Sequence, residues 1–178
     1  EGMFNASALG HMLNYIEVIE FYDGTIWGWN EITQYMLDAQ STDGDDTITG
    51  FFFGDVMDGG LGNDYLQGGN DGDTYIFNPG YGSDTINDYP TWATYDLGDT
   101  VEFGTGFTFN DMILSRDGSS LVITFQGFTD QLTIEGQFSN NTTLYEVELF
   151  RFADATELSI SDMRQIYYNG TDGDDYIE

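Results

Sequence analysis

An aspartate recurs every nine residues in the middle of this chain, at Asp46, Asp55, Asp64 and Asp73. A fifth one, Asp84, keeps the same place in the pattern after a two-residue insertion at residues 77–78. Two positions after each aspartate stands a large apolar residue, and these residues are Ile48, Met57, Leu66, Tyr75 and Ile86. Such a short fixed period predicts a stack of similar units, each of which contributes one turn and one short strand.

The glycines that open each repeat predict tight turns, because glycine accepts positive φ and lets backbone carbonyls approach an ion. The three residues after each turn predict a short strand whose central apolar residue points inward. If successive strands alternate between two parallel sheets, each turn stacks on the turn two repeats later. Asp46, Asp64 and Asp84 then line one edge, while Asp55 and Asp73 line the other.

Stacked carboxylates repel one another unless a cation lies between them, and Ca²⁺ suits this donor set. It takes about six to eight oxygen ligands in flexible geometry, whereas Mg²⁺ needs a stricter octahedron. Transition metals prefer imidazole or thiolate, and the chain has one histidine and no cysteine. The predicted ligands are the repeated carboxylates and nearby turn residues, namely Asp43, Gly44, Asp46, Asp55, Gly59, Leu61, Asn63, Asp64, Gly68, Asn70, Asp71, Gly72, Asp73, Gly82, Asp84 and Asp175.

Three complete calcium sites follow from this stacking, between residues 46 and 64, 55 and 73, and 64 and 84. Half-sites at the ends would raise the number to five. On this scheme Asp64 belongs to two sites and Asp73 to one. The second repeat is the irregular one, because its turn carries Phe51, Phe52 and Phe53 in place of small or polar residues.

The charge balance restricts the partners of the chain. Three basic residues against 32 acidic ones give a formal charge of −29, which argues against binding to nucleic acid or to anionic membranes. The 14 Phe, 12 Tyr and 3 Trp argue for a folded chain, since disordered acidic segments have few aromatic residues. A helix that crosses a membrane needs about 18 consecutive apolar residues, and the chain contains no apolar run of that length.

The five repeats match G-G-x-G-x-D-x-U-x, so this part of the chain resembles the RTX (repeats-in-toxin) haemolysin-type calcium-binding repeats. Residues 98–168, with GDTVEF near the start and YEVELFRF further on, resemble the haemolysin-type calcium-binding-related domain that interrupts such arrays. A partial second copy lies at residues 1–40. The resemblance implies a calcium-bound β-roll and type I secretion of a chain that folds outside the cell, where calcium is millimolar.

A second period of about 130 residues is also present. Residues 19–25 (IEFYDGT) match residues 150–156 (FRFADAT), and a short helical pattern follows each segment, at 31–38 and 162–168. The same calcium-repeat motif then follows, at residues 42–48 and 171–177. Asp23 and Asp154, which lie in the matching segments, are predicted to form turns rather than to bind calcium.

We therefore expect an all-β fold, with a parallel β-roll packed against an antiparallel-rich β module that has one short helix, in a tandem repeat. The expected divisions are the end of a preceding flanking module (1–40), the calcium-binding β-roll (41–88), a flanking module (89–168) and the first turn of the next roll (169–178). The strand pattern predicts a hairpin turn at residues 116–119. We expect the chain to be a piece of a longer one.

The side chains offer little for catalysis, so we expect no enzymatic activity. The only histidine is His11, and Ser119 and Ser120 lie in a turn without a foreseeable histidine partner. Arg116, Arg151 and Arg164 are expected to pair with surface acids.

The favoured function is a calcium-dependent structural or folding module of a large secreted bacterial protein, such as an adhesin, a surface-layer protein or a stalk. Its partners would be calcium and neighbouring repeats, with surface glycans or self-assembly as further options. Two alternatives remain open at this point. One is a module of a secreted enzyme or toxin, such as a lipase, a protease or an alginate epimerase, and the other is a module that binds carbohydrate through Trp27, Trp29 or Trp92.

Overall fold

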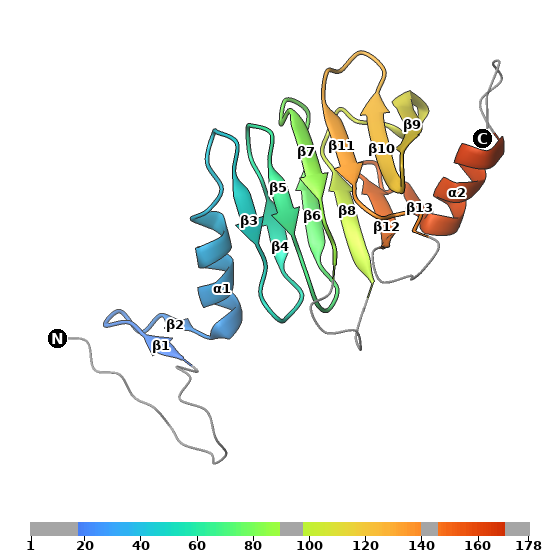
Figure 1. Ribbon diagram of the computed structural model, residues 1–178. Helices are drawn as coiled ribbons and strands as arrows, with labels where there is room; N and C mark the ends of the chain where they lie inside the picture. Colours follow the sequence, from blue (N-terminus) through green and yellow to red (C-terminus); the bar gives the residue numbers. More distant parts are fainter. Residues whose placement is uncertain (1–17, 90–97, 140–145, 170–178) are drawn as a thin grey trace.

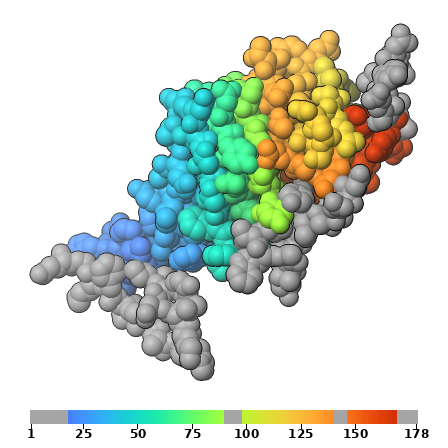
Figure 2. Space-filling model, viewed as in Figure 1, coloured from blue at the N-terminus to red at the C-terminus, as the bar shows by residue number. Residues whose placement is uncertain are grey.

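The computed structural model describes residues 18–89, 98–139 and 146–169, which form a mostly β fold with two helices (Figure 1). A small antiparallel sheet of β1 (Ile19–Glu20) and β2 (Ile26–Trp27) precedes helix α1 (Trp29–Asp38). Two larger sheets, of six and five strands, follow. In Figure 2 the blue N-terminal elements lie at one end of the described residues and the red C-terminal helix at the other.

The repeats supply five short strands, which are β3 (Thr47–Thr49), β4 (Val56–Asp58), β5 (Tyr65–Gln67), β6 (Thr74–Phe77) and β7 (Ser83–Ile86). Strands β3, β5 and β7 are neighbours in the six-stranded sheet, whereas β4 and β6 are neighbours in the five-stranded one. Both sets are parallel, and the register pairs Ile48 with Leu66 and Met57 with Tyr75. The predicted pairing of each strand with the strand two repeats later is therefore confirmed.

The flanking strands continue these two sheets instead of packing against them as a separate module, which corrects the predicted arrangement. Strand β8 (Asp99–Phe103) pairs in parallel with β6, and β12 (Val147–Phe152) pairs in parallel with β8. Strand β11 (Gln131–Ile134) pairs in parallel with β7. The antiparallel pairs lie further out, where β9 (Met112–Asp117) and β10 (Ser120–Phe125) extend β11, and β13 (Glu157–Ser159) extends β12.

A short 3₁₀ helix, η1 (Phe109–Asp111), leads into β9, and the predicted hairpin turn joins β9 to β10. Gly118 lies in this turn with a φ of 60°, a value that glycine adopts without steric cost. The second α-helix, α2 (Ile160–Asn169), follows β13. Both helices are longer than their sequence patterns predicted. Among the described residues no helix is long and apolar enough to span a membrane.

The two hairpin–helix segments at the ends of the described chain have the same local geometry. Ile19 pairs with Trp27 in the first hairpin, and Phe150 pairs with Leu158 in the second. In each turn an aspartate carboxylate accepts the amide of the residue two positions later, and this distance is 2.9 Å for both Asp23 and Asp154. Both aspartates are therefore turn formers, as predicted. These hydrogen bonds lower the pKa of both carboxyls.

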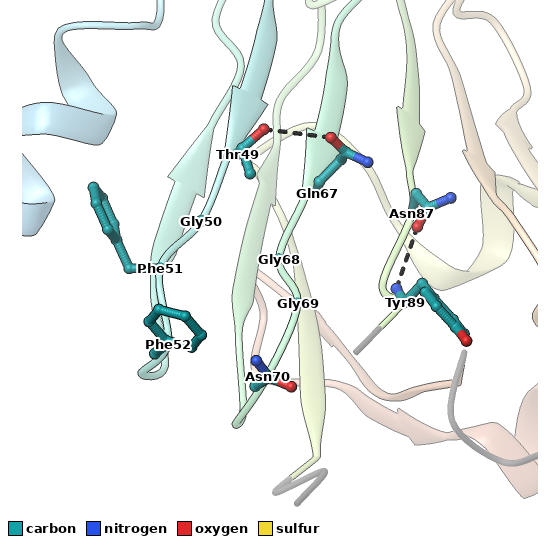
Figure 3. A pocket seen from close by; sticks show the side chains of 10 residues that line it. All are labelled: Thr49, Gly50, Phe51, Phe52, Gln67, Gly68, Gly69, Asn70, Asn87 and Tyr89. Atoms are coloured by element: carbon teal, nitrogen blue, oxygen red, sulfur yellow. Dashed lines mark hydrogen bonds between the residues drawn. The ribbon is translucent and has the colours of Figure 1, made fainter. Parts of the chain in front are cut away.

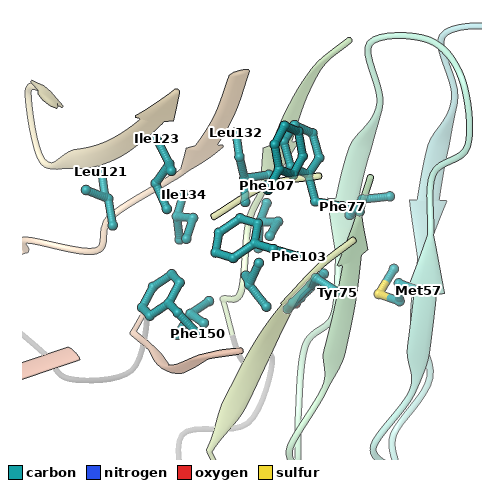
Figure 4. Packing of buried hydrophobic residues seen from close by; sticks show 14 of the residues in the cluster. Met57, Tyr75, Phe77, Phe103, Phe107, Leu121, Ile123, Leu132, Ile134 and Phe150 are labelled. Atoms are coloured by element: carbon teal, nitrogen blue, oxygen red, sulfur yellow. The ribbon is translucent and has the colours of Figure 1, made fainter. Parts of the chain in front are cut away.

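The core lies between the two large sheets. All five apolar residues of the repeats are at most 1% exposed, as the inward orientation requires. Further along the stack the core becomes aromatic, as Phe77, Phe103 and Phe107 show (Figure 4). Phe103 from the five-stranded sheet contacts Phe125 from the six-stranded sheet with ring centroids 5.2 Å apart. Phe107 stacks on Phe125 at 4.0 Å. One continuous core therefore joins the repeats to the flanking strands.

We predict that Phe103→Ala lowers the free energy of unfolding of the calcium-loaded protein by about 3–5 kcal/mol, because it opens a cavity between the sheets. The matched control is Phe52→Ala, since Phe52 is 65% exposed. That change should cost about 0.5 kcal/mol or less. Urea denaturation followed by circular dichroism measures both values, and equal losses would contradict a core shared by the two sheets.

Candidate calcium-binding site

The repeated aspartates stack in two rows, and each row is held by the same contact. In the first row the backbone N–H of Asp46 donates to Oδ1 of Asp64 at 2.8 Å, and that of Asp64 donates to Oδ1 of Asp84 at 3.0 Å. In the second row the N–H of Asp55 donates to Oδ1 of Asp73 at 2.8 Å. The predicted assignment of the five aspartates to two edges is thus confirmed.

The first two repeats close their turns in the same way. The amide of Thr42 donates to Oδ2 of Asp46 at 2.6 Å, and the amide of Phe51 donates to Oδ2 of Asp55 at 2.5 Å. The phenylalanines of the second repeat therefore leave the turn itself unchanged. Phe52 and Phe53 lie on its surface, 65% and 55% exposed.

Deeper in the stack the second carboxylate oxygen has no such donor. Oδ2 of Asp64, Asp73 and Asp84 is fully buried and accepts no hydrogen bond from any described residue. A buried polar atom without a partner is costly, and a buried charge is costlier still. These oxygens are suited to ligate a cation.

The electrostatics point the same way. Burial, helped by nearby carboxylates, raises the pKa of Asp73 to about 8 and that of Asp84 to about 7. Burial also raises the pKa of Asp55 and of Asp64. Without a cation, folding therefore favours the protonated form of these four carboxyl groups.

No arginine neutralises these rows, because the three arginines of the chain are held elsewhere. The groups that bind them are the Gly118 carbonyl for Arg116, Glu102 and Glu157 for Arg151, and Glu146 for Arg164. The expected pairing with surface acids is confirmed for Arg151, whereas Arg164 pairs with Glu146, which is buried. Arg116 differs, since it also lies over the Phe138 ring at 5.4 Å.

The turn glycines allow the stacked turns to approach each other closely. A Cβ on Gly62 would lie 2.6 Å from the Gly44 carbonyl oxygen, and one on Gly82 would collide with the Gly62 carbonyl. Any side chain at these positions would separate the turns. At Gly50 a Cβ would lie 2.6 Å from the Gly68 carbonyl oxygen and 2.7 Å from Oδ2 of Asp55, so a backbone carbonyl and a carboxylate converge there, as an oxygen-rich cation site requires.

The remaining predicted ligands lie in the same turns but in varied settings. Asn63 accepts the Ser83 amide at 3.0 Å through its side-chain oxygen and donates to Asp45 at 3.0 Å through its amide nitrogen. Asp71 has a left-handed φ of 65°. Of the others, Gly59 and Gly68 are buried, Asn70 and Gly72 are half-buried, and Asp43, Gly44 and Leu61 are exposed, while Asp175 lies outside the described residues.

The structure adds two aspartates that the sequence analysis missed. The N–H of Asp73 donates to Oδ1 of Asp99 at 2.7 Å, so the second row continues into β8. Asp130, just before β11, accepts the amides of Gly80 and Gly82 at 2.9 and 3.0 Å. Like the repeat aspartates, both stand two positions before a buried apolar residue. This spacing is the sequence signal that could have identified them. Their spacing falls outside the nine-residue period.

Asp99 corrects the predicted scheme of pairs. Asp73 has a stacked carboxylate neighbour on each side, Asp55 and Asp99, so it does not belong to a single pair. It is equivalent to Asp64 in this respect, and the expected difference between Asp64 and Asp73 is not supported. In the first row, Asp46 has one stacked neighbour, which is Asp64.

The residues considered for other functions lie apart from the rows. Trp27 packs against Phe21 and Tyr35, with ring centroids 5.0 and 5.3 Å away, which favours packing over sugar binding. Trp29 begins α1 and is 37% exposed. Trp92 and His11 lie outside the described residues.

Comparison with known proteins agrees with the calcium-binding resemblance. Residues 121–162 match the family model of the haemolysin-type calcium binding protein related domain. The chain is also 29% identical over 105 residues to the iron-regulated protein FrpA of Neisseria meningitidis serogroup C. That alignment covers 58% of this chain and 9% of FrpA, so the chain spans a small part of its relative.

We predict that Asp64→Asn raises the calcium concentration at the folding midpoint more than Asp46→Asn does. Asp64 has two stacked neighbours and Asp46 has one, while both changes remove the same charge. Calcium titration followed by far-UV circular dichroism measures the two midpoints. Equal shifts of the two midpoints would show that Asp64 does not take part in calcium binding with both of its stacked neighbours.

We also predict that the calcium-free protein becomes less stable as the pH rises from about 5 to about 8. The pKa values of Asp84 and Asp73 are raised to about 7 and about 8 in the folded state, so the folded chain holds protons that the unfolded chain releases. The stability linked to these protons is complete at low pH and is lost as the pH passes through the raised values.

Thermal unfolding of calcium-stripped protein across this range measures the effect. Asp84→Asn should remove the part of the loss that accumulates up to about pH 7, whereas Asp117→Asn, at an exposed residue, should not. A calcium-free protein that is as stable at pH 8 as at pH 5 would contradict the raised pKa values.

Proposed function

We propose that this chain is a calcium-dependent structural and folding module, in which residues 41–88 form a parallel β-roll that Ca²⁺ holds together. The observation that carries the proposal is the set of buried, unpartnered Oδ2 atoms of Asp64, Asp73 and Asp84. Three further observations support Ca²⁺, namely the all-oxygen donor set, the engagement of every arginine elsewhere and the match to a calcium-binding-related family.

Calcium would make folding conditional. An ion that binds the folded rows but not the unfolded chain stabilises the fold by RT ln(1 + [L]/Kd) at each site. Extracellular calcium modules have dissociation constants of about 10⁻⁴ to 10⁻³ M, so cytosolic calcium would leave such sites empty. We therefore propose that the chain is exported unfolded, through a type I system, and folds outside the cell.

We also propose that the module is one unit of a tandem array. The registers of the two hairpins support this, since Ile19 with Trp27 and Phe150 with Leu158 are related by the same offset of 131 residues. The same offset relates α1 to α2. Helix α1 packs on the edge of the repeat strands, where Gln34 donates to the Val56 carbonyl at 2.9 Å. Helix α2 would cover the next roll in the same way.

An array of such units fits a stalk, a surface-layer protein or an adhesin, and in that role the module has no catalytic activity of its own. A secreted enzyme or toxin with a calcium-binding tail is the alternative. Because the chain spans 9% of FrpA, the activity of the whole protein depends on sequence outside this segment. The partners that we propose are Ca²⁺ and neighbouring units of the same chain.

The direct test is a calcium titration of the calcium-stripped protein, followed by far-UV circular dichroism and by thermal unfolding. We expect strand signal and melting temperature to rise with calcium, and the same concentration of Mg²⁺ to have little effect. Asp64→Asn combined with Asp84→Asn should abolish most of the response. A spectrum and melting temperature that are the same in calcium and in chelator would contradict the proposal.

A further inference from the structure

A buried carboxylate cluster lies where the repeats meet the flanking strands. Its members are Asp73, Asp88 and Asp99, which are 1%, 2% and 0% exposed. One oxygen from each carboxylate lies within 4.8 Å of the other two. Ligands of a single calcium ion at about 2.4 Å are separated by no more than about twice that distance, so three such oxygens can contact one ion.

The three residues come from both large sheets. Asp73 precedes β6 and Asp99 begins β8, and these strands are neighbours in the five-stranded sheet. Asp88 follows β7, which belongs to the six-stranded sheet. Asp88 occupies the position where the next repeat would begin, which is glycine in Gly59 and Gly68. It is therefore a departure from the repeat pattern and not one of its regular ligands.

The strongest sign of a ligand is Oδ2 of Asp73. This atom is buried and accepts no hydrogen bond from the described part of the chain. It points into the cluster, because a Cβ on Gly68 would collide with it and with Tyr75 Oη, and would lie 2.8 Å from Oδ1 of Asp88. The glycine leaves the space on which these oxygens converge.

Tyr75 fixes the third carboxylate. Its hydroxyl donates to Oδ1 of Asp88 at 2.5 Å. Burial first, and then the charges of Asp88 and Asp73, raise the pKa of Tyr75, so the phenol keeps its proton and remains a donor. Tyr75 is thus a positioning residue, which holds Asp88 toward the other two acids.

We propose that Asp73, Asp88 and Asp99 bind one Ca²⁺ ion at a site that joins the two sheets. Three carboxylates this close repel one another strongly, and the arginines are bound elsewhere. Oxygen donors alone favour Ca²⁺ over transition metals. The site shares Asp73 and Asp99 with the second aspartate row, so it rests on the proposed calcium-dependent function, but Asp88 is outside both rows.

A surface groove lies beside Gly68, the glycine next to the cluster. Gly68 lines a surface groove of about 600 Å³ together with Phe52, Asn70 and Tyr89, the residue after Asp88 (Figure 3). Tyr89 is 51% exposed, while Asp88 is buried. None of the three carboxylates lines the groove, so on this proposal the ion passes Gly68 to reach them and is enclosed after binding.

The site would couple the repeats to the flanking strands. Asp88 and Asp99 stand on either side of the connection between β7 and β8, so one ion would fix both ends of it. Because β8 pairs with both β6 and β12, the order that calcium imposes on the turns would pass into the flanking sheet. Filling this site would complete the fold.

The test counts the bound ions in the whole chain by native mass spectrometry at saturating calcium. Asp88→Asn keeps an oxygen that can accept from Tyr75 but removes the charge, and it should bind one Ca²⁺ ion fewer than the wild type. Asp117→Asn removes the same charge at an exposed turn and should keep the wild-type number. An unchanged count in Asp88→Asn would overturn this site and leave the aspartate rows intact.

A second variant decides the matter if Asp88→Asn does not fold. Tyr75→Phe keeps all three carboxylates and removes the hydrogen bond, so the count should stay the same while the dissociation constant of one ion rises about 10-fold or more. If Tyr75→Phe lowers only the melting temperature and leaves every calcium affinity unchanged, Tyr75 and Asp88 form a structural pair without an ion. A wild type that binds no calcium would refute the proposed function as well.

Discussion

The structure depends on the stacking of carboxylates inside it. Each turn is fixed to the turn two repeats later by a backbone N–H that donates to an aspartate, as in the contact from Asp55 to Asp73. This contact uses one carboxylate oxygen and buries the other, so the geometry that orders the turns also concentrates uncompensated charge. Such an arrangement is stable only if protons or cations neutralise the acids.

This constraint explains why so acidic a chain can fold around an apolar core. The three-residue strands β3, β4 and β5 bury one residue each, such as Met57 or Leu66, and a strand this short has little stability of its own. Repulsion within a chain of charge −29 opposes their association. Cations that neutralise the turns would remove this opposition, so the apolar core and the ions would stabilise the same state.

The continuity of the sheets gives the turns a wider effect. Because β8 and β11 pair directly with repeat strands, the flanking strands have no separate boundary with the repeats. The core is continuous as well, from Tyr75 through Phe103 to Phe150. The order of the turns and the order of the flanking strands are therefore linked through backbone hydrogen bonds and through side-chain packing.

The sequence alone determined the local part of this structure. A fixed period constrains each repeat in the same way, so the parallel pairing, the inward residues and the two rows from Asp46 to Asp84 could be predicted. The two turns at Asp23 and Asp154 could also be predicted from the sequence, because their hydrogen bonds reach only two residues along the chain.

Tertiary structure alone decided which distant residues join the rows. Asp99 joins the second row because β8 adds to one sheet, and Asp130 reaches the amides of Gly80 and Gly82 because β11 adds to the other. No period relates these strands to the repeats. Asp88 meets Asp73 for a similar reason, since the chain changes sheets between them. The packing of the whole core selects which strands far apart in sequence pair with each other, so a local sequence pattern does not predict this pairing.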